Sequence, residues 1–156
     1  MNRLSHSDIP SLFDQPSVPP TRAEKLFSVA ESLLSVLSRG QELSASVVRV
    51  AMTNTFGGSD AEGLWCWKDA YEASEVAGVL FLRKFRTSLL KEDVTKQLGI
   101  LGKIQSAMLT QNKRSDVSVA YQQFSTPFVL ARLCAEAAMI SLGDVCLLYT
   151  SPSPRD

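Results

Sequence analysis

Long apolar runs are missing from this chain of 156 residues, and with no run of about 18 apolar residues a membrane-spanning helix is not expected. The first 20 residues have neither a continuous apolar segment nor a small-residue cleavage site, so a secretory signal is not expected either. Histidine occurs once, at His6, and the three cysteines, Cys66, Cys134 and Cys146, lie far apart. They make no metal site and no disulfide framework. We therefore expect a cytoplasmic protein with no membrane association and no bound metal.

Net charge is also absent, since 16 basic residues balance 16 acidic ones, but the charges are unevenly distributed. Residues 83–114 carry eight basic and two acidic groups, a local net charge of +6. This segment is a candidate contact surface for the DNA backbone. The alternative is that these charges are only the solvated faces of two helices. The eight candidate residues are Arg83, Lys84, Arg86, Lys91, Lys96, Lys103, Lys113 and Arg114.

Proline is nearly absent from the interior: four of the seven prolines lie in residues 1–20, two near the C-terminus, and only Pro127 lies between. The interior is therefore free to form helices, and the two ends are expected to be disordered. Thr21 is a good N-cap for a first helix that is closed by Gly40, and a second helix is expected to start near Ser44 and to end at Phe56-Gly57-Gly58. Periodicity predicts that the first helix buries Leu26, Ala30, Leu33, Leu34 and Leu37, and the second Val47, Val50 and Ala51.

Two further helices are predicted before residue 111. Ser59 or Asp60 is the expected cap of a long third helix, and a fourth is expected near residues 92–110. On the third helix Trp67 and Tyr71 share the apolar stripe and are expected to be core residues, whereas Trp65 points elsewhere and is the better candidate for a contact surface. Cys66 and Cys134 are expected to be small core residues.

A polar step, QQFSTP at residues 122–127, leads into an apolar, alanine-rich helix that is expected to begin at Pro127 with Thr126 or Ser125 as its cap. Ala131, Ala135 and Ala138 would allow this helix to pack closely on a sheet. A turn at residues 141–144 then leads to Val145, where a buried strand is expected to begin. Residues 146–156, CLLYTSPSPRD, are identical to one translated reading frame of a widely used sequencing adapter. We interpret these residues as a sequencing artefact and exclude them from fold reasoning.

The order of polar step, helix, Gly-Asp turn and strand resembles the start of the catalytic domain of adenine-N6 DNA methyltransferases. A second stretch, FGGSDAEGLWCWKDAYEASEVAGVLFLRKF at residues 56–85, resembles the N-terminal region of bacterial and plasmid-borne methylase/helicase proteins of the strawberry notch type. The resemblance extends loosely from residue 22 to Val145. It implies a helical leader followed by a methyltransferase-like domain and, much later, a superfamily-2 helicase-like ATPase.

The predicted helices and this resemblance together give a mainly α chain with four parts. These are a disordered tail (1–20), a helical leader domain of about four helices (21–120), the start of an α/β, Rossmann-like methyltransferase domain that the resemblance implies to be truncated (121–145), and the artefact (146–156). The parent protein would use S-adenosylmethionine, ATP and Mg²⁺ and would bind DNA and the remainder of its own chain. Phe124, Ser125, Thr126 and Pro127 are the candidate cofactor-binding residues. The glycine loop, the catalytic motif and all helicase motifs are missing, so no residue here is assigned a catalytic role, and the chain alone is expected to be inactive.

Two alternatives follow from the same residues. The loop GGSDAEG lacks the Gly-Lys-Ser/Thr ending of a phosphate-binding loop, and its carboxylates would repel phosphate, so a helix stop followed by a new cap is favoured. The whole chain could also be a non-enzymatic helical DNA-binding or adaptor module in which QQFSTP is only a helix cap.

Overall fold

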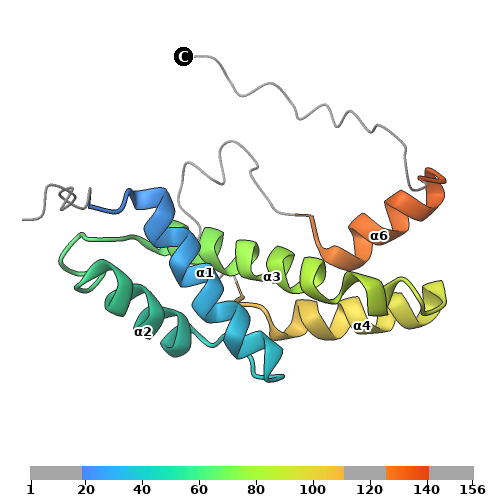
Figure 1. Cartoon of the computed structure of the whole chain (residues 1–156), viewed down its shortest axis with the longest axis horizontal. Helices are drawn as coiled ribbons and strands as arrows, with labels where there is room; N and C mark the ends of the chain where they lie inside the picture. The colour runs from blue at the N-terminus through green and yellow to red at the C-terminus, as the bar shows by residue number, and fades with distance from the viewer. Residues whose placement is uncertain (1–18, 111–125, 141–156) are drawn as a thin grey trace, which may run out of the picture.

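The computed structural model describes residues 19–110 and 126–140 (Figure 1). These residues form helices and no strand, in agreement with the predicted mainly helical fold class. The helices are α1 (Arg22–Ser38), α2 (Ala45–Phe56), α3 (Trp67–Leu89), α4 (Val94–Ala107) and α6 (Phe128–Ala137). The N-terminal tail to residue 18, the expected strand at Val145 and residues 146–156 lie outside the described residues.

Hydrogen bonds between residues close in the sequence cap the N-terminal ends of three helices, at or near the predicted starting positions. Thr21 and Glu24 form a capping box at α1, in which Glu24 Oε2 accepts the Thr21 N–H at 2.7 Å. The Ser44 side chain accepts the Val47 N–H at α2. Asp93 accepts the Lys96 N–H, which places the start of α4 at Val94. α2 ends at Gly57, whose φ of 82° is the left-handed conformation that glycine adopts without strain.

α1 lies between α2 and α3 and supplies the largest share of the core (Figure 1). Most of the core side chains come from these three helices and the two loops beside α2: Val29, Ala30, Leu33, Leu37, Leu43, Val48, Met52, Trp65, Ala70, Ala73 and Ala77. The small residues on α3 allow it to approach α1 closely. The predicted face of α1 is confirmed for Ala30, Leu33 and Leu37, whereas Leu26 and Leu34 are only partly buried.

The predicted buried face of α2 is wrong. Val48 and Met52 are fully buried, while Val50 is 59% exposed and Val47 and Ala51 are partly exposed. The observed face lies about a third of a turn around the helix axis from the predicted one. The predicted and the observed faces are both apolar, so the position of α1 decides which of them is buried.

The third helix begins at Trp67, eight positions after the earlier of the two predicted caps, Ser59. Residues 60–63 form turns, in which Gly63 has a φ of 73° and the Glu62 carboxylate accepts the Ser59 N–H at 2.6 Å. The hydrogen bond between Ser59 and Glu62 resembles one at the start of a helix, but the left-handed Gly63 interrupts helical geometry. The chain between α2 and α3 therefore turns at this point, and Trp65 lies in the core.

Asp69, in the first turn of α3, ties this helix to α1. Its carboxylate accepts hydrogen bonds from the Cys66 N–H at 2.7 Å and from the Arg22 guanidinium at 2.5 Å. Partial burial opposes ionisation of this carboxyl, but the two hydrogen bonds outweigh burial and hold the pKa of Asp69 below its ordinary value. The hydrogen bond between Arg22 and Asp69 also raises the pKa of Arg22.

α4 and α6 lie together beside the second half of α3 (Figure 1). The Leu43 N–H donates to the Ala107 carbonyl at 2.8 Å, which fixes the end of α4 against the α1–α2 connection. At the centre of this arrangement a Cβ on Gly78 of α3 would lie 2.9 Å from Cζ of Phe128 and 3.0 Å from Cε of Met108. Glycine at this position therefore lets α6 and the end of α4 approach α3.

Candidate nucleic-acid and cofactor-binding surfaces

Six of the eight candidate DNA contacts lie within the described residues, and all six are exposed. Arg83, Lys84 and Arg86 belong to the last turns of α3, Lys91 to the α3–α4 connection, and two more to α4. Lys113 and Arg114 lie outside the described residues. The structure therefore gathers half of the predicted set at the end of α3 and the turn that follows it.

The positive charges of this group differ in their surroundings. On α4, the Lys96 ammonium lies 3.3 Å from the Glu92 carboxylate and 3.4 Å from that of Asp93, so the two acidic groups of the segment neutralise this position. Lys84 lies 3.4 Å from Ser38 Oγ and 5.4 Å from the centroid of the Phe85 ring. Its charge is held close to the protein surface but meets no carboxylate in the described residues.

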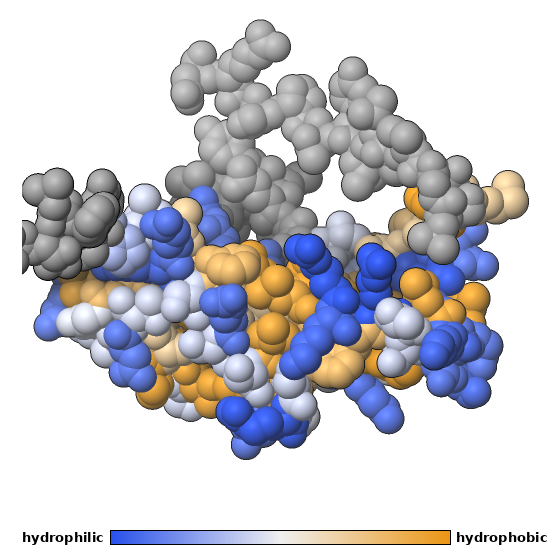
Figure 2. Space-filling model, in the orientation of Figure 1, coloured by the Kyte–Doolittle hydropathy of each residue, from blue (hydrophilic) through white to orange (hydrophobic). Residues whose placement is uncertain are grey.

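Arg83 and Arg86 lie one turn apart on α3 and therefore share a side of the helix that Lys84 does not. On the face of the molecule shown in Figure 2, an apolar area over α1 and α3 is flanked by strongly hydrophilic side chains. A groove of about 510 Å³ lies here between the two helices, with Arg83 at its edge. The predicted basic surface is therefore two surfaces, one beside an apolar groove and one away from it.

The candidate cofactor-binding step is described only in part, since Phe124 and Ser125 lie outside the described residues. Pro127 is the N-cap of α6 and not its first residue, and no side chain of the cap residue bonds the helix. The prediction that Thr126 caps this helix is wrong. The Phe128 N–H instead donates to Oε1 of Gln105, a residue of α4, at 3.0 Å.

This cap from another helix reduces what the α6 N-terminus can offer to a ligand. Pro127 has no N–H, Gln105 accepts the Phe128 N–H, and the Ala131 N–H bonds the Pro127 carbonyl. Only the N–H groups of Val129 and Leu130 are without a partner among the described residues. Two adjacent donors are enough to hold one carboxylate or one pair of ribose hydroxyls.

α6 presents one side to α4 and another to solvent. On the inner side Phe128 packs at Gly78, and the Arg132 Nε donates to Gln97 Oε1 at 2.8 Å while its Nη1 lies 2.7 Å from Glu136. On the outer side Leu130 is 50% exposed and Leu133 44% exposed. The alanines that were expected to pack on a sheet are not buried, and no strand is present in the described residues.

Side-chain positions correct the predictions for Trp65 and for the two cysteines, and they confirm in part that Trp67 packs against the core. Trp65 is a core residue, not a contact surface: it is 2% exposed and its indole N–H donates to the Gly58 carbonyl at 2.9 Å. Trp67 lies at the edge of the core, where its indole N–H bonds Asp60 at 3.0 Å and the Arg49 guanidinium lies 5.3 Å from its ring centroid. Cys66 and Cys134 are exposed free thiols.

The Gly57–Gly63 loop uses its own donors internally. Glu62 accepts both the N–H and the hydroxyl of Ser59, at 2.6 and 2.8 Å, and these bonds lower the pKa of Glu62. A phosphate placed here would have to displace a carboxylate. Within residues 19–110 and 126–140 no group of three or more potential metal ligands occurs, and none of the helices is long and apolar enough to cross a membrane.

Comparison with known proteins gave no match to a family model, to a curated protein or to a solved structure.

Proposed function

We propose that this chain is the helical leader of a DNA-modifying methylase/helicase of the strawberry notch type. In this proposal α1–α4 form a support, and α6 is the first helix of an S-adenosylmethionine-dependent, adenine-N6 methyltransferase-like domain. ATP and Mg²⁺ belong to a helicase-like ATPase elsewhere in the parent protein. The chain alone is then expected neither to transfer methyl groups nor to hydrolyse ATP.

The observation that carries the proposal is the two-sided environment of α6. Its inner side is held by Gln105 and Gln97 of α4, while the outer Leu130 and Leu133 are about half exposed. A helix fixed on one side and apolar on the other is suited to receive a further layer of structure. A Rossmann-like sheet would supply that layer, because such sheets are covered by helices on both faces.

The cofactor would bind at the N-terminal end of α6. Val129 and Leu130 supply two backbone donors, with Thr126 and Pro127 beside them, and Phe124 and Ser125 are proposed to complete this wall. The opposite wall would be the glycine loop after the first strand of the methyltransferase-like domain. This chain therefore contributes orientation and hydrogen bonds, and no group in it carries out methyl transfer.

The decisive test is to sequence the natural locus downstream of the codon for Val145. We expect a strand followed within about ten residues by a glycine-containing loop. A stop codon, or a long polar linker at that point, would overturn the proposal and leave a helical DNA-binding or adaptor module as the better description.

DNA contact is proposed for the basic residues at the end of α3, with Lys84 and Lys91 as the residues that lie away from the groove. The K84Q/K91Q variant should bind a DNA duplex more weakly, and the slope of log K against log salt should fall by about 1.8 if each lysine contacts one phosphate. The matched control is K96Q, whose charge Glu92 and Asp93 already neutralise. Fluorescence anisotropy over a salt series measures both. Equal losses in the variant and the control would refute the assignment.

A further inference from the structure

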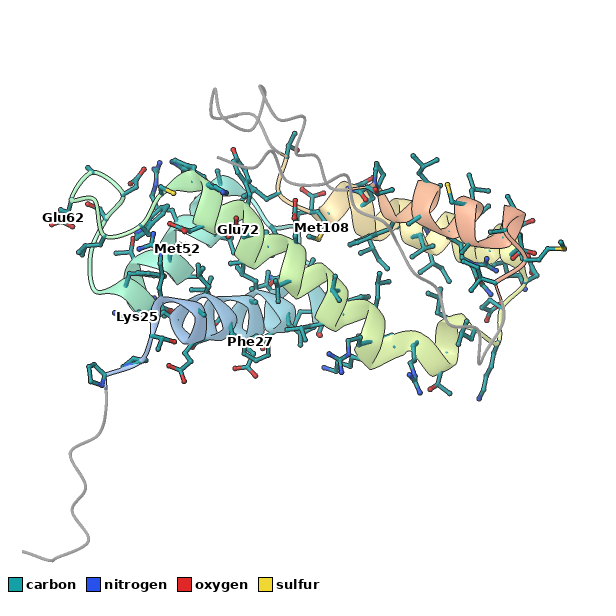
Figure 3. All side chains as sticks on the ribbon, turned by 90° about the horizontal axis from the view of Figure 1, so that it is seen from above. Lys25, Phe27, Met52, Glu62, Glu72 and Met108 are labelled. Carbon is teal, nitrogen blue, oxygen red and sulfur yellow. The ribbon has the colours of Figure 1, made fainter. Side chains whose placement is uncertain are left out.

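The groove between α1 and α3 is the surface from which we infer an oligomeric state. Its apolar lining includes Phe27 of α1 and Val76 and Val79 of α3, which are 49%, 40% and 50% exposed. Figure 3 labels Phe27 on α1 and Glu72 on α3, which crosses α1 in that view. Half-exposed side chains of this size grouped in one groove are typical of an interaction surface.

Charge along this side of α3 is ordered by sign. Positions 72, 76, 79, 83 and 86 are spaced by four and three residues alternately, so they lie in one row on the helix. From the N-terminal end, the row and its flanking residue read Glu72, Glu75, Val76, Val79, Arg83 and Arg86. The acidic end, the apolar centre and the basic end each occupy about one turn.

This order makes the surface complementary to itself. If two copies of α3 lie antiparallel about a two-fold axis at Val79, Glu72 faces the partner's Arg86, and Glu75 faces the partner's Arg83. Every such contact occurs twice, as in any two-fold interface. A parallel arrangement would place glutamates against glutamates and arginines against arginines, which is unfavourable.

We propose that the partner of this groove is a second copy of the chain, bound in that antiparallel orientation. Val79 packs on its symmetry mate at the centre, Val76 and Phe27 enlarge the apolar patch, and the glutamates and arginines close it at both ends. The proposal is independent of the methyltransferase assignment. It assigns Arg83 and Arg86 to protein contacts and leaves Lys84 and Lys91 for DNA.

The ion pair that Glu72 makes within the chain is weak. Within the described residues Glu72 pairs with Lys68 at 3.8 Å, and both side chains are more than half exposed. An exposed pair of this kind contributes little and can be exchanged for a partner's arginine. No ion pair joins Arg83 or Arg86 to another described residue.

The size of the surface predicts a weak dimer. The row from residue 72 to residue 86 is about 21 Å long at 1.5 Å per residue, and a helix with its side chains is about 10–12 Å wide. Two faces of this size amount to about 500 Å², to which Phe27 of each copy adds, so the interface belongs to the small, transient class. We therefore expect dissociation in the micromolar range, weakened by salt.

Complementary charge reversal tests this arrangement in the full chain. Two variants are made, E72R/E75R and R83E/R86E, and each is examined by sedimentation velocity over a concentration series. Each variant alone should self-associate at least about tenfold more weakly than the wild type, because like charges then meet at both ends of the interface. An equimolar mixture should regain a dimer, since the two reversed surfaces complement each other.

K84E is the matched control, because it reverses a charge on the same turn of α3 but away from the row, and it should leave self-association unchanged. Circular dichroism confirms that each variant is folded, and recovery of the dimer in the mixture is itself evidence that both variants fold. The proposal is overturned if the wild type stays monomeric throughout the micromolar range. It is equally overturned if both variants dimerise as the wild type does, or if their mixture does not associate.

Discussion

The indole of Trp65 provides the most direct test of the core. Trp65 is 2% exposed, donates to the Gly58 carbonyl at 2.9 Å and meets the Trp67 ring edge to face at a centroid distance of 5.8 Å. Replacing it with alanine would cost about 3–5 kcal/mol, which is comparable with the whole stability of many small domains. The informative substitution is therefore Trp65→Phe, which keeps an aromatic ring in the core.

The expected cost of Trp65→Phe has two parts. Loss of the hydrogen bond to Gly58 costs about 1 kcal/mol, and the space left by the smaller ring, on the order of 40 Å³, costs about 1 kcal/mol more. The total is about 2 kcal/mol. Trp67→Phe is the matched control: Trp67 is partly exposed, and its partner Asp60 is 28% exposed, so the loss should be about 1 kcal/mol or less.

Urea unfolding followed by far-ultraviolet circular dichroism measures both losses, with an unchanged m value as the sign that only stability has altered. The two residues are the only tryptophans, so each variant also leaves a single tryptophan to be followed by selective excitation. In Trp67→Phe the remaining tryptophan, Trp65, is buried. Its emission maximum should therefore lie at a shorter wavelength than that of Trp67 in Trp65→Phe, and acrylamide should quench it less. Equal losses in the two variants, or free quenching of Trp65, would show that the assignment of Trp65 to the core is wrong.

Two further predictions concern helix starts. Asp69→Asn should destabilise the chain by about 1–2 kcal/mol at about pH 7, because Asp69 ties α3 to Arg22 of α1. A lowered pKa means that this stabilisation is present above the ordinary aspartate pKa of about 3.9 and is lost as the pH falls through the folded-state value. The deficit in urea unfolding should therefore shrink by about pH 2.5, and a deficit independent of pH would contradict the pKa argument. Gln105→Ala should speed hydrogen exchange in α6 by removing about 0.5–1 kcal/mol, while Thr126→Ala should not; the reverse result would restore Thr126 as the cap.

The caps and stops of the first two helices and the start of the fourth were predictable because they depend on contacts within about four residues. Thr21 with Glu24, Ser44 with Val47, and the left-handed Gly57 satisfy backbone groups that any helix leaves open, whatever packs against it. Composition and periodicity likewise indicated a mainly helical chain. The local charge excess at residues 83–114 was also visible in the sequence, but not its division between a groove and an open surface.

Tertiary structure decided which side of each helix is buried, because that depends on a neighbour far away in the sequence. Val48 and Met52 are buried, and Val50 is not, because of the position of α1 against α2. Trp65 was misassigned because helical periodicity was extended through a segment in which the left-handed Gly63 ends that periodicity.

The α6 cap shows the same limit at the candidate cofactor site. The sequence predicted that a neighbouring hydroxyl, of Thr126 or Ser125, caps this helix. The Phe128 N–H instead donates to Gln105, 23 positions earlier in the chain. Only the packing of α6 on α4 brings that amide within reach. The sequence by itself thus determined which segments are helical and where several of them begin, since these are properties of a few consecutive residues. The folded chain determined which surfaces remain open for a cofactor, for DNA or for a second copy, since an open surface is one that no distant element covers.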